Sequence, residues 1–138
     1  MVSEAERALP METGGVLVGY WATEFDEVVI TDIIGPGPRA LHRTDRFIPD
    51  PRFQQAAIAE FYRKSGRLHT YLGDWHTHPG STPYLSGLDR RTLKAIADFR
   101  GARAPVPLMA VLGGLDPWDL RVWQYVPRAC LSLRTLAE

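Results

Sequence analysis

The sequence has almost no cysteine: Cys130 is the only one in 138 residues. Because a disulfide within the chain needs two cysteines, none can form, and a zinc site built from several thiolates is excluded as well. We expect Cys130 to be a buried structural thiol rather than a nucleophile. A chain without disulfides suits a reducing compartment, so the cytoplasm is the expected location.

The sequence also lacks an excess of either charge and any long apolar run. Sixteen lysines and arginines balance sixteen aspartates and glutamates, so the formal net charge is zero. That balance gives no electrostatic support for nucleic-acid binding. No apolar stretch is long enough to span a bilayer, and residues 1–7 are charged, unlike a signal peptide. We therefore expect neither a nucleic-acid partner nor a membrane partner.

The chain shows no internal repeat and no long linker, so residues 1–138 are expected to form a single domain. Asp50 and Ser86 are typical helix caps, and Ser3 with Glu6 matches a capping box. With the apolar spacing that follows them, they predict helices over residues 3–9, 51–65 and 86–100. Short β-rich runs predict strands over residues 16–21, 28–34, 70–76, 107–112 and 118–126.

The remaining segments are shorter or less regular. Asp26 and Glu27 are expected to form a turn, and residues 47–48 a short edge element. Residues 130–136 fit either a last strand or a short helix. Strands that alternate with helices predict an α/β or α+β fold, in which a mixed sheet is sandwiched by helices.

Two histidines and an aspartate form the most informative pattern. Successive side chains of a strand point to opposite faces, so His76 and His78 share one face and can aim at a single point. Asp89 reaches that point if the chain turns back through residues 79–86, which are rich in proline, glycine and serine. Two imidazoles and one carboxylate, with a fourth position left to water, are typical of a catalytic zinc site. We therefore predict that these three residues bind Zn²⁺.

Simpler interpretations exist for the same residues. Ser86 and Asp89 match a capping box, in which the aspartate only stabilises the start of a helix. Combined with the two histidines, the metal interpretation is favoured, because the helix start would bring a carboxylate back to the end of the strand. The other two histidines, His42 and His69, are interpreted as ordinary surface residues.

A hydrolytic zinc site also needs a base that takes a proton from water. Glu12 is the best candidate, because it stands between a proline and two glycines at the start of the first strand. Ser86 could donate its hydroxyl to the oxyanion that forms when an amide carbonyl is attacked. A solvated glutamate near a turn is the alternative for Glu12, and spacing alone leaves both roles open.

The full pattern resembles the JAMM motif of the JAB/MPN zinc metalloprotease family, whose members include deubiquitinases. His76-x-His78-Pro79 is followed after six residues by Ser86 and after two more by Asp89, with Glu12 upstream. The resemblance implies that His76, His78 and Asp89 hold Zn²⁺, that Glu12 passes the water's proton to the leaving amine, and that Ser86 steadies the oxyanion. It also implies an MPN/JAB domain, related in shape to the cytidine deaminases.

The resemblance extends to the short prokaryotic JAB-domain proteins, which are often encoded beside bacterial activating (E1-like) and conjugating (E2-like) enzymes, some in anti-phage systems. It implies a zinc isopeptidase or peptidase that cleaves after the C-terminus of a ubiquitin-like protein or of a similarly conjugated protein. The segment before Glu12 is short, and little room follows Asp89 for a ubiquitin-gripping insertion. Substrate is therefore expected to use residues 36–49 and the sheet edges, with small residues such as glycine at the end of its tail.

Three other functions fit the sequence less well. The intact ligand set argues against a non-catalytic scaffold of the same fold. A zinc deaminase needs a P-C-x-x-C segment, which a single cysteine cannot supply. A DNA-repair relative shares the motif, but the zero net charge gives it no support.

Overall fold

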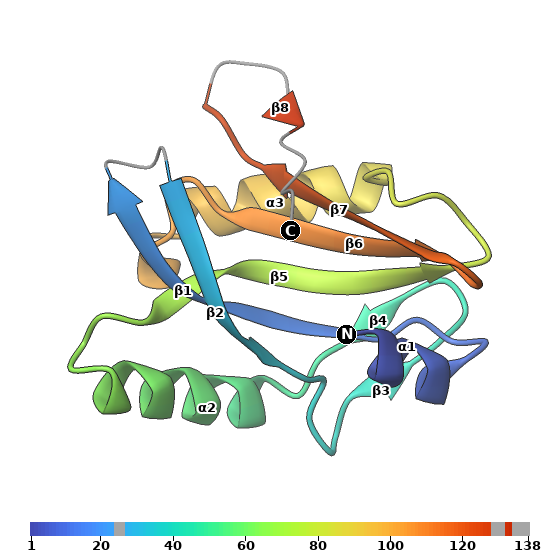
Figure 1. Ribbon diagram of the computed structural model, residues 1–138, viewed down its shortest axis with the longest axis horizontal. Coiled ribbons are helices and arrows are strands. Elements are labelled where there is room, and N and C mark those ends of the chain that lie inside the picture. The colour runs from blue at the N-terminus through green and yellow to red at the C-terminus, as the bar shows by residue number, and fades with distance from the viewer. Residues whose placement is uncertain (24–26, 128–131, 134–138) are drawn as a thin grey trace.

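The computed structural model of the chain describes residues 1–23, 27–127 and 132–133, and shows one twisted sheet with helices packed against it (Figure 1). The helices are α1 (Val2–Ala8), α2 (Pro51–Lys64), α3 (Gly87–Asp98) and the short 3₁₀ helix η1 (Arg100–Ala102). The strands are β1 (Gly14–Thr23), β2 (Glu27–Ile34), β3 (Leu41–His42), β4 (Phe47–Ile48), β5 (Thr70–Pro79), β6 (Leu108–Gly114), β7 (Trp118–Gln124) and β8 (Ser132–Leu133).

The main sheet is mixed, as the sequence predicts. Its strand order is β2-β1-β5-β6-β7-β8, while β3 and β4 form a separate hairpin. β5 and β6 run parallel, and the other neighbouring pairs are antiparallel. A parallel pair cannot be joined by a tight turn, and α3 lies in the long connection between β5 and β6.

The helices cover both faces of the sheet. Residues on one face of β1 pack against α2, and residues on the same face of β6 pack with Leu93 of α3. The opposite face carries a second apolar cluster, and Met1 at the start of α1 packs there. Apolar side chains alternate between these faces along each strand, which is why short β-rich runs bury residues on both sides. The expected sheet sandwiched by helices is confirmed.

A bulge in β5 sets which side chains reach the α2 and α3 face. Leu17 pairs with Gly73, but Val18 pairs with Tyr71, so Leu72 is an extra residue in β5. Tyr71 and Asp74 would lie on opposite faces of a regular strand, and the bulge places them on one face. Gly73 has φ +151°, and a Cβ on it would lie 1.9 Å from the Leu108 carbonyl oxygen. Only glycine fits this position.

Caps define the two long helices as expected. The Asp50 side chain accepts a hydrogen bond from the Phe53 N–H, and Pro51 occupies the first turn of α2. Ser86 caps α3 through a complete capping box with Asp89. Because these caps satisfy N–H groups that have no partner within the helix, they fix where each helix begins.

Several predicted boundaries are wrong. The histidines lie inside β5, which continues to Pro79 because it keeps pairing with β6. The predicted capping box at Ser3 is absent, since α1 begins at Val2 and has no side-chain cap. The third helix ends at Asp98, and η1 follows. Of the ambiguous tail, β8 pairs with β7 as a strand, whereas Cys130 and Asp26 lie outside the described residues.

Candidate metal centre

β5 brings the two predicted histidine ligands to one point. Their Nε2 atoms lie 3.0 Å apart, as expected for residues two apart on one face of a strand. Asp89 approaches from the first turn of α3, with Oδ1 3.2 Å from His76 Nε2 and Oδ2 3.5 Å from His78 Nε2. The three predicted ligands therefore form one cluster.

The spacing and chemistry of this cluster fit Zn²⁺. Ligands at tetrahedral angles, about 2.0–2.1 Å from zinc, lie roughly 3.3–3.4 Å from one another. His78 Nδ1 is 3.1 Å from the Thr82 carbonyl oxygen, which can only accept, so Nδ1 carries the hydrogen. In the neutral ring, the form that binds a metal, the lone pair of His78 is then on Nε2, the atom that faces the cluster. A backbone carbonyl that orients a histidine in this way is common at metal sites.

Asp89 both caps the start of α3 and faces the two histidines as a candidate metal ligand. Its N–H donates to the Ser86 hydroxyl at 3.1 Å, and its Oδ2 accepts the Ser86 N–H at 2.6 Å. Burial raises the pKa of Asp89, but contacts with His76, His78 and Ser86 outweigh burial and hold the pKa well below its usual range. The carboxylate is therefore ionised, as a metal ligand must be. The capping and metal interpretations are compatible.

Glu12 lies beside the cluster, in the segment between α1 and β1. Its side chain lines a cavity of about 270 Å³ together with His76 and Asp89. Burial raises the pKa of Glu12, while the nearby histidines lower it and the carboxylates of Asp89 and Asp45 raise it. A carboxylate with a raised pKa, next to a candidate metal site, has the properties of a general base.

Comparison with known proteins agrees with this geometry. The family described as prokaryotic homologs of the JAB domain matches residues 1–126. The chain belongs to the prokaryotic JAB family. Its matched region includes every residue of the cluster and Glu12.

Two relatives extend the comparison of this JAB chain to named proteins. "Probable metalloprotease y4qB" of Sinorhizobium fredii is 42% identical, over 97% of this chain and 84% of that protein. The "CD-NTase/cGAS isopeptidase" of Enterobacter hormaechei is 32% identical, over 85% of this chain but only 63% of that protein. A Desulfitobacterium hafniense protein solved in solution has a TM-score of 0.69 at 21% identity, covering 97% of this chain and 82% of that one. The last similarity shows the fold alone.

The named relatives and the intact cluster show that the JAB chain is a JAMM-type hydrolase. The metalloprotease relative and the His-His-Asp set fit a bound metal ion. Within the described residues, no helix is long and apolar enough to cross a bilayer.

Two features of the JAB site were missed by sequence reasoning. Thr77, between the histidines, is fully buried on the opposite face, where its hydroxyl accepts the Thr13 N–H at 3.0 Å. Asp74 lies on the histidine face and accepts the Tyr71 hydroxyl at 2.9 Å. The period-two pattern that found His76 and His78 could have placed Asp74, but no local signal marks the partner of Thr77.

His42 and His69, interpreted as ordinary surface histidines, each make specific contacts within the fold. Both side chains are half-buried. His69 stacks on Tyr20 and contacts the Thr31 hydroxyl. His42 Nδ1 lies 3.0 Å from the carbonyl oxygen of Glu12. All three partners are distant in the sequence, so none of these contacts could be recognised from local pattern.

Proposed function

We propose that this chain is a zinc-dependent isopeptidase or peptidase that cleaves the amide bond after the C-terminus of a ubiquitin-like protein or a similarly conjugated protein. The observation that supports it best is the cluster of His76, His78 and Asp89, two of whose members, His76 and Asp89, line one cavity with Glu12. The isopeptidase name of one relative supports an amide link to a modifier as the substrate.

His76, His78 and Asp89 would hold the metal through the atoms that face one another in the cluster. When bound, Zn²⁺ polarises a scissile carbonyl and lowers the pKa of a coordinated water. Glu12 takes a proton from the attacking water and delivers it to the leaving nitrogen. Burial raises the pKa of Glu12, so its carboxylic acid releases this proton less readily to bulk water. The raised pKa of Glu12 is also closer to that of the leaving amine, which favours proton transfer to the nitrogen.

Ser86 is assigned to the oxyanion. Its oxygen already accepts the Asp89 N–H, which leaves the hydrogen of its own hydroxyl for another acceptor. In this proposal that acceptor is the oxygen of the attacked carbonyl. The capping box holds Ser86 at a fixed place next to a metal ligand, so the donor needs no reorganisation during the reaction.

The substrate tail is assigned to the cavity between the β3–β4 hairpin and α3. Phe47 of the hairpin and Leu88 of α3 line this cavity together with the site residues. A volume of about 270 Å³ accommodates a thin extended tail more readily than one with large side chains, so we infer a preference for glycine at its end. Tails ending in glycine should be cleaved at least about tenfold faster than tails ending in phenylalanine. Faster cleavage of the tail that ends in phenylalanine would exclude this cavity as the binding site of the substrate tail.

We also propose that the protein works in the cytoplasm with E1-like and E2-like enzymes encoded beside it, in a bacterial conjugation system of the anti-phage kind. The reading of neighbouring genes tests this directly. Conjugating-like genes next to this one support the assignment, and neighbours without such genes count against it.

Glu12→Gln is the decisive test of the proposed chemistry. The variant should keep stoichiometric zinc, measured by elemental analysis, and lose hydrolysis of ubiquitin-like tails linked to an aminocoumarin amide. Glu6→Gln, on an exposed position of α1, is the matched control and should retain full activity. Retained turnover in Glu12→Gln rejects Glu12 as the base. Stoichiometric zinc in a wild-type protein that cleaves no tail favours a non-catalytic scaffold instead.

A further inference from the structure

We propose that His42 is a positioning residue that orients Glu12 by holding the peptide bond between Glu12 and Thr13. The inference rests on the proposed function, because it assumes that Glu12 is the base. His42 belongs to β3, in a part of the chain to which neither the motif nor the metal cluster assigns a role.

The tautomer of His42 follows from its partner. His42 Nδ1 lies 3.0 Å from the Glu12 carbonyl oxygen. A carbonyl oxygen can only accept a hydrogen bond, so Nδ1 carries a hydrogen and donates it. That hydrogen is present both in this neutral tautomer and in the imidazolium, so the contact does not depend on the charge of the ring.

The other end of the same peptide bond is held by Thr77. The Thr13 N–H donates to the Thr77 hydroxyl at 3.0 Å. Thr77 stands between the two histidine ligands in the sequence of β5. A peptide group is planar, so two hydrogen bonds at its carbonyl and its N–H fix the orientation of the whole plane. That plane sets ψ of Glu12 and, with it, the direction of the Glu12 side chain. The base is thus aligned from the hairpin on one side and from the metal-binding strand on the other.

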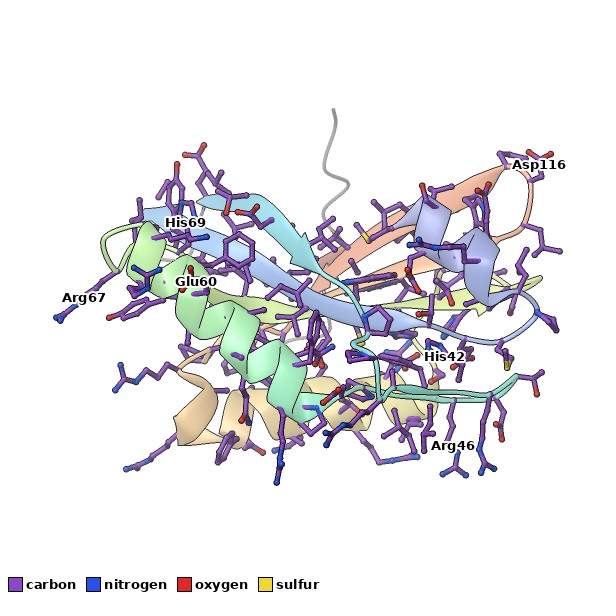
Figure 2. All side chains as sticks on the ribbon, turned by 90° about the horizontal axis from the view of Figure 1, so that it is seen from below. His42, Arg46, Glu60, Arg67, His69 and Asp116 are labelled. Atoms are coloured by element: carbon purple, nitrogen blue, oxygen red, sulfur yellow. The ribbon has the colours of Figure 1, made fainter. Side chains whose placement is uncertain are left out.

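The hairpin that carries His42 is itself anchored at this point. The Glu12 N–H donates to the Arg43 carbonyl at 2.8 Å, so two consecutive residues hold both polar main-chain groups of Glu12. The ring of His42 lies 5.5 Å from that of Phe47, and a Cβ added to Gly14 would lie 2.9 Å from the Phe47 ring. Figure 2 shows His42 between the hairpin and the chain that leads into β1. Because the hairpin packs this closely, its histidine is a fixed donor.

The test compares His42→Leu, which removes the donor, with His42→Asn, whose amide nitrogen can donate from a place close to that of Nδ1. Displacement of a catalytic group by about 1 Å can cost roughly 100-fold in rate, so kcat of His42→Leu should fall about 10- to 100-fold with little change in KM. His42→Asn should recover kcat to within about threefold of wild type. Both variants should keep stoichiometric zinc, since His42 contacts none of the three ligands in the described structure.

His69 supplies the matched control. It is also half-buried and hydrogen-bonded, but it stacks on Tyr20 near the other end of β1. His69→Leu and His69→Asn should leave kcat unchanged. If His69→Leu lowers kcat as much as His42→Leu does, general destabilisation explains both and the proposal is wrong. A His42→Asn variant as slow as His42→Leu, at equal zinc content, also overturns it and indicates proton transfer by the ring.

A measurement on the wild-type protein removes the dependence on folded variants and on activity. ¹⁵N chemical shifts of the histidine ring report the tautomer, and those of His42 should show hydrogen on Nδ1. An Nε2–H tautomer overturns the proposal whatever the kinetics. If Glu12→Gln is active while His42 has the Nδ1–H tautomer and holds the peptide, the base assignment fails and the contact itself stands.

Discussion

Replacement of Thr77 by valine removes one buried hydroxyl from β5, on the face opposite the histidine ligands, with little change in the volume of the side chain. Thr77 is fully buried, and its hydroxyl is the acceptor for the Thr13 N–H and a donor to the Thr13 carbonyl at 3.4 Å. Valine leaves the Thr13 N–H without a partner, whereas the Thr13 carbonyl keeps the Thr77 N–H at 2.9 Å. A single buried donor therefore loses its hydrogen bond.

The expected cost follows from that count. An unsatisfied buried donor costs about 1–3 kcal/mol, so the free energy of unfolding should fall by that amount. For a chain of this length, the loss corresponds to a decrease in Tm of about 3–10 °C. Zinc should be retained because the ligands lie on the opposite face of β5. We expect kcat to fall about tenfold, since the peptide after Glu12 loses one of its two anchors.

Denaturant unfolding, zinc content and cleavage of an aminocoumarin tail test this prediction together. Thr31→Val is the control. The Thr31 side chain is exposed, and its hydroxyl contacts the Val18 carbonyl oxygen and His69 Nδ1, each at 3.3 Å. Because water can replace both contacts, the free energy of unfolding should change by less than about 0.5 kcal/mol. Thr77→Ser keeps the hydroxyl and should retain kcat. An unfolding free energy and a kcat in Thr77→Val equal to those of wild type would refute the reasoning.

Two further predictions concern the strand that carries the histidines. Burial raises the pKa of Asp74 from 3.8 to about 6 in the metal-free protein, although the Tyr71 hydroxyl lowers it. The folded state therefore binds this proton more tightly than the unfolded state, and stability falls as pH rises from about 4 to 6. Asp74→Asn should stabilise the metal-free protein by up to about 3 kcal/mol at pH 7–8, with no gain below about pH 4. Equal Tm values for the metal-free variant and the metal-free wild-type protein at pH 7.5 would contradict this prediction. Gly73→Ala should lower the free energy of unfolding by at least about 3 kcal/mol, because the added Cβ meets the Leu108 carbonyl and φ of residue 73 is positive. A variant with the Tm of the wild-type protein would show that the bulge does not require glycine.

The parts of the fold that the sequence could predict are those encoded by neighbouring residues. Helix starts at Asp50 and Ser86 follow from cap residues, and the shared face of His76 and His78 follows from strand geometry. The approach of Asp89 was predictable as well, because the capping box and the ligand position use the same helix start.

The parts that could not be predicted depend on contacts between distant segments. The extension of β5 to Pro79 comes from pairing with β6, which lies beyond a complete helix. The extra residue Leu72 comes from the register with β1. The contact of His42 with Glu12 joins residues 30 apart, and both residue types are common on surfaces. Local pattern therefore locates the ligands, while the supporting hydrogen bonds require the structure.

The parallel alignment of β5 and β6 explains why the ligands converge at all. After β5, the polypeptide must return along the whole length of the sheet before β6 can begin, and the return path starts where β5 ends. The first turn of the returning helix is consequently delivered to the strand end that bears the imidazoles, without any added loop or subdomain. Inserted residues between Pro79 and Ser86 would lengthen that path and move the Asp89 carboxylate away from the two imidazoles. This short connector should therefore tolerate substitutions far better than changes in length.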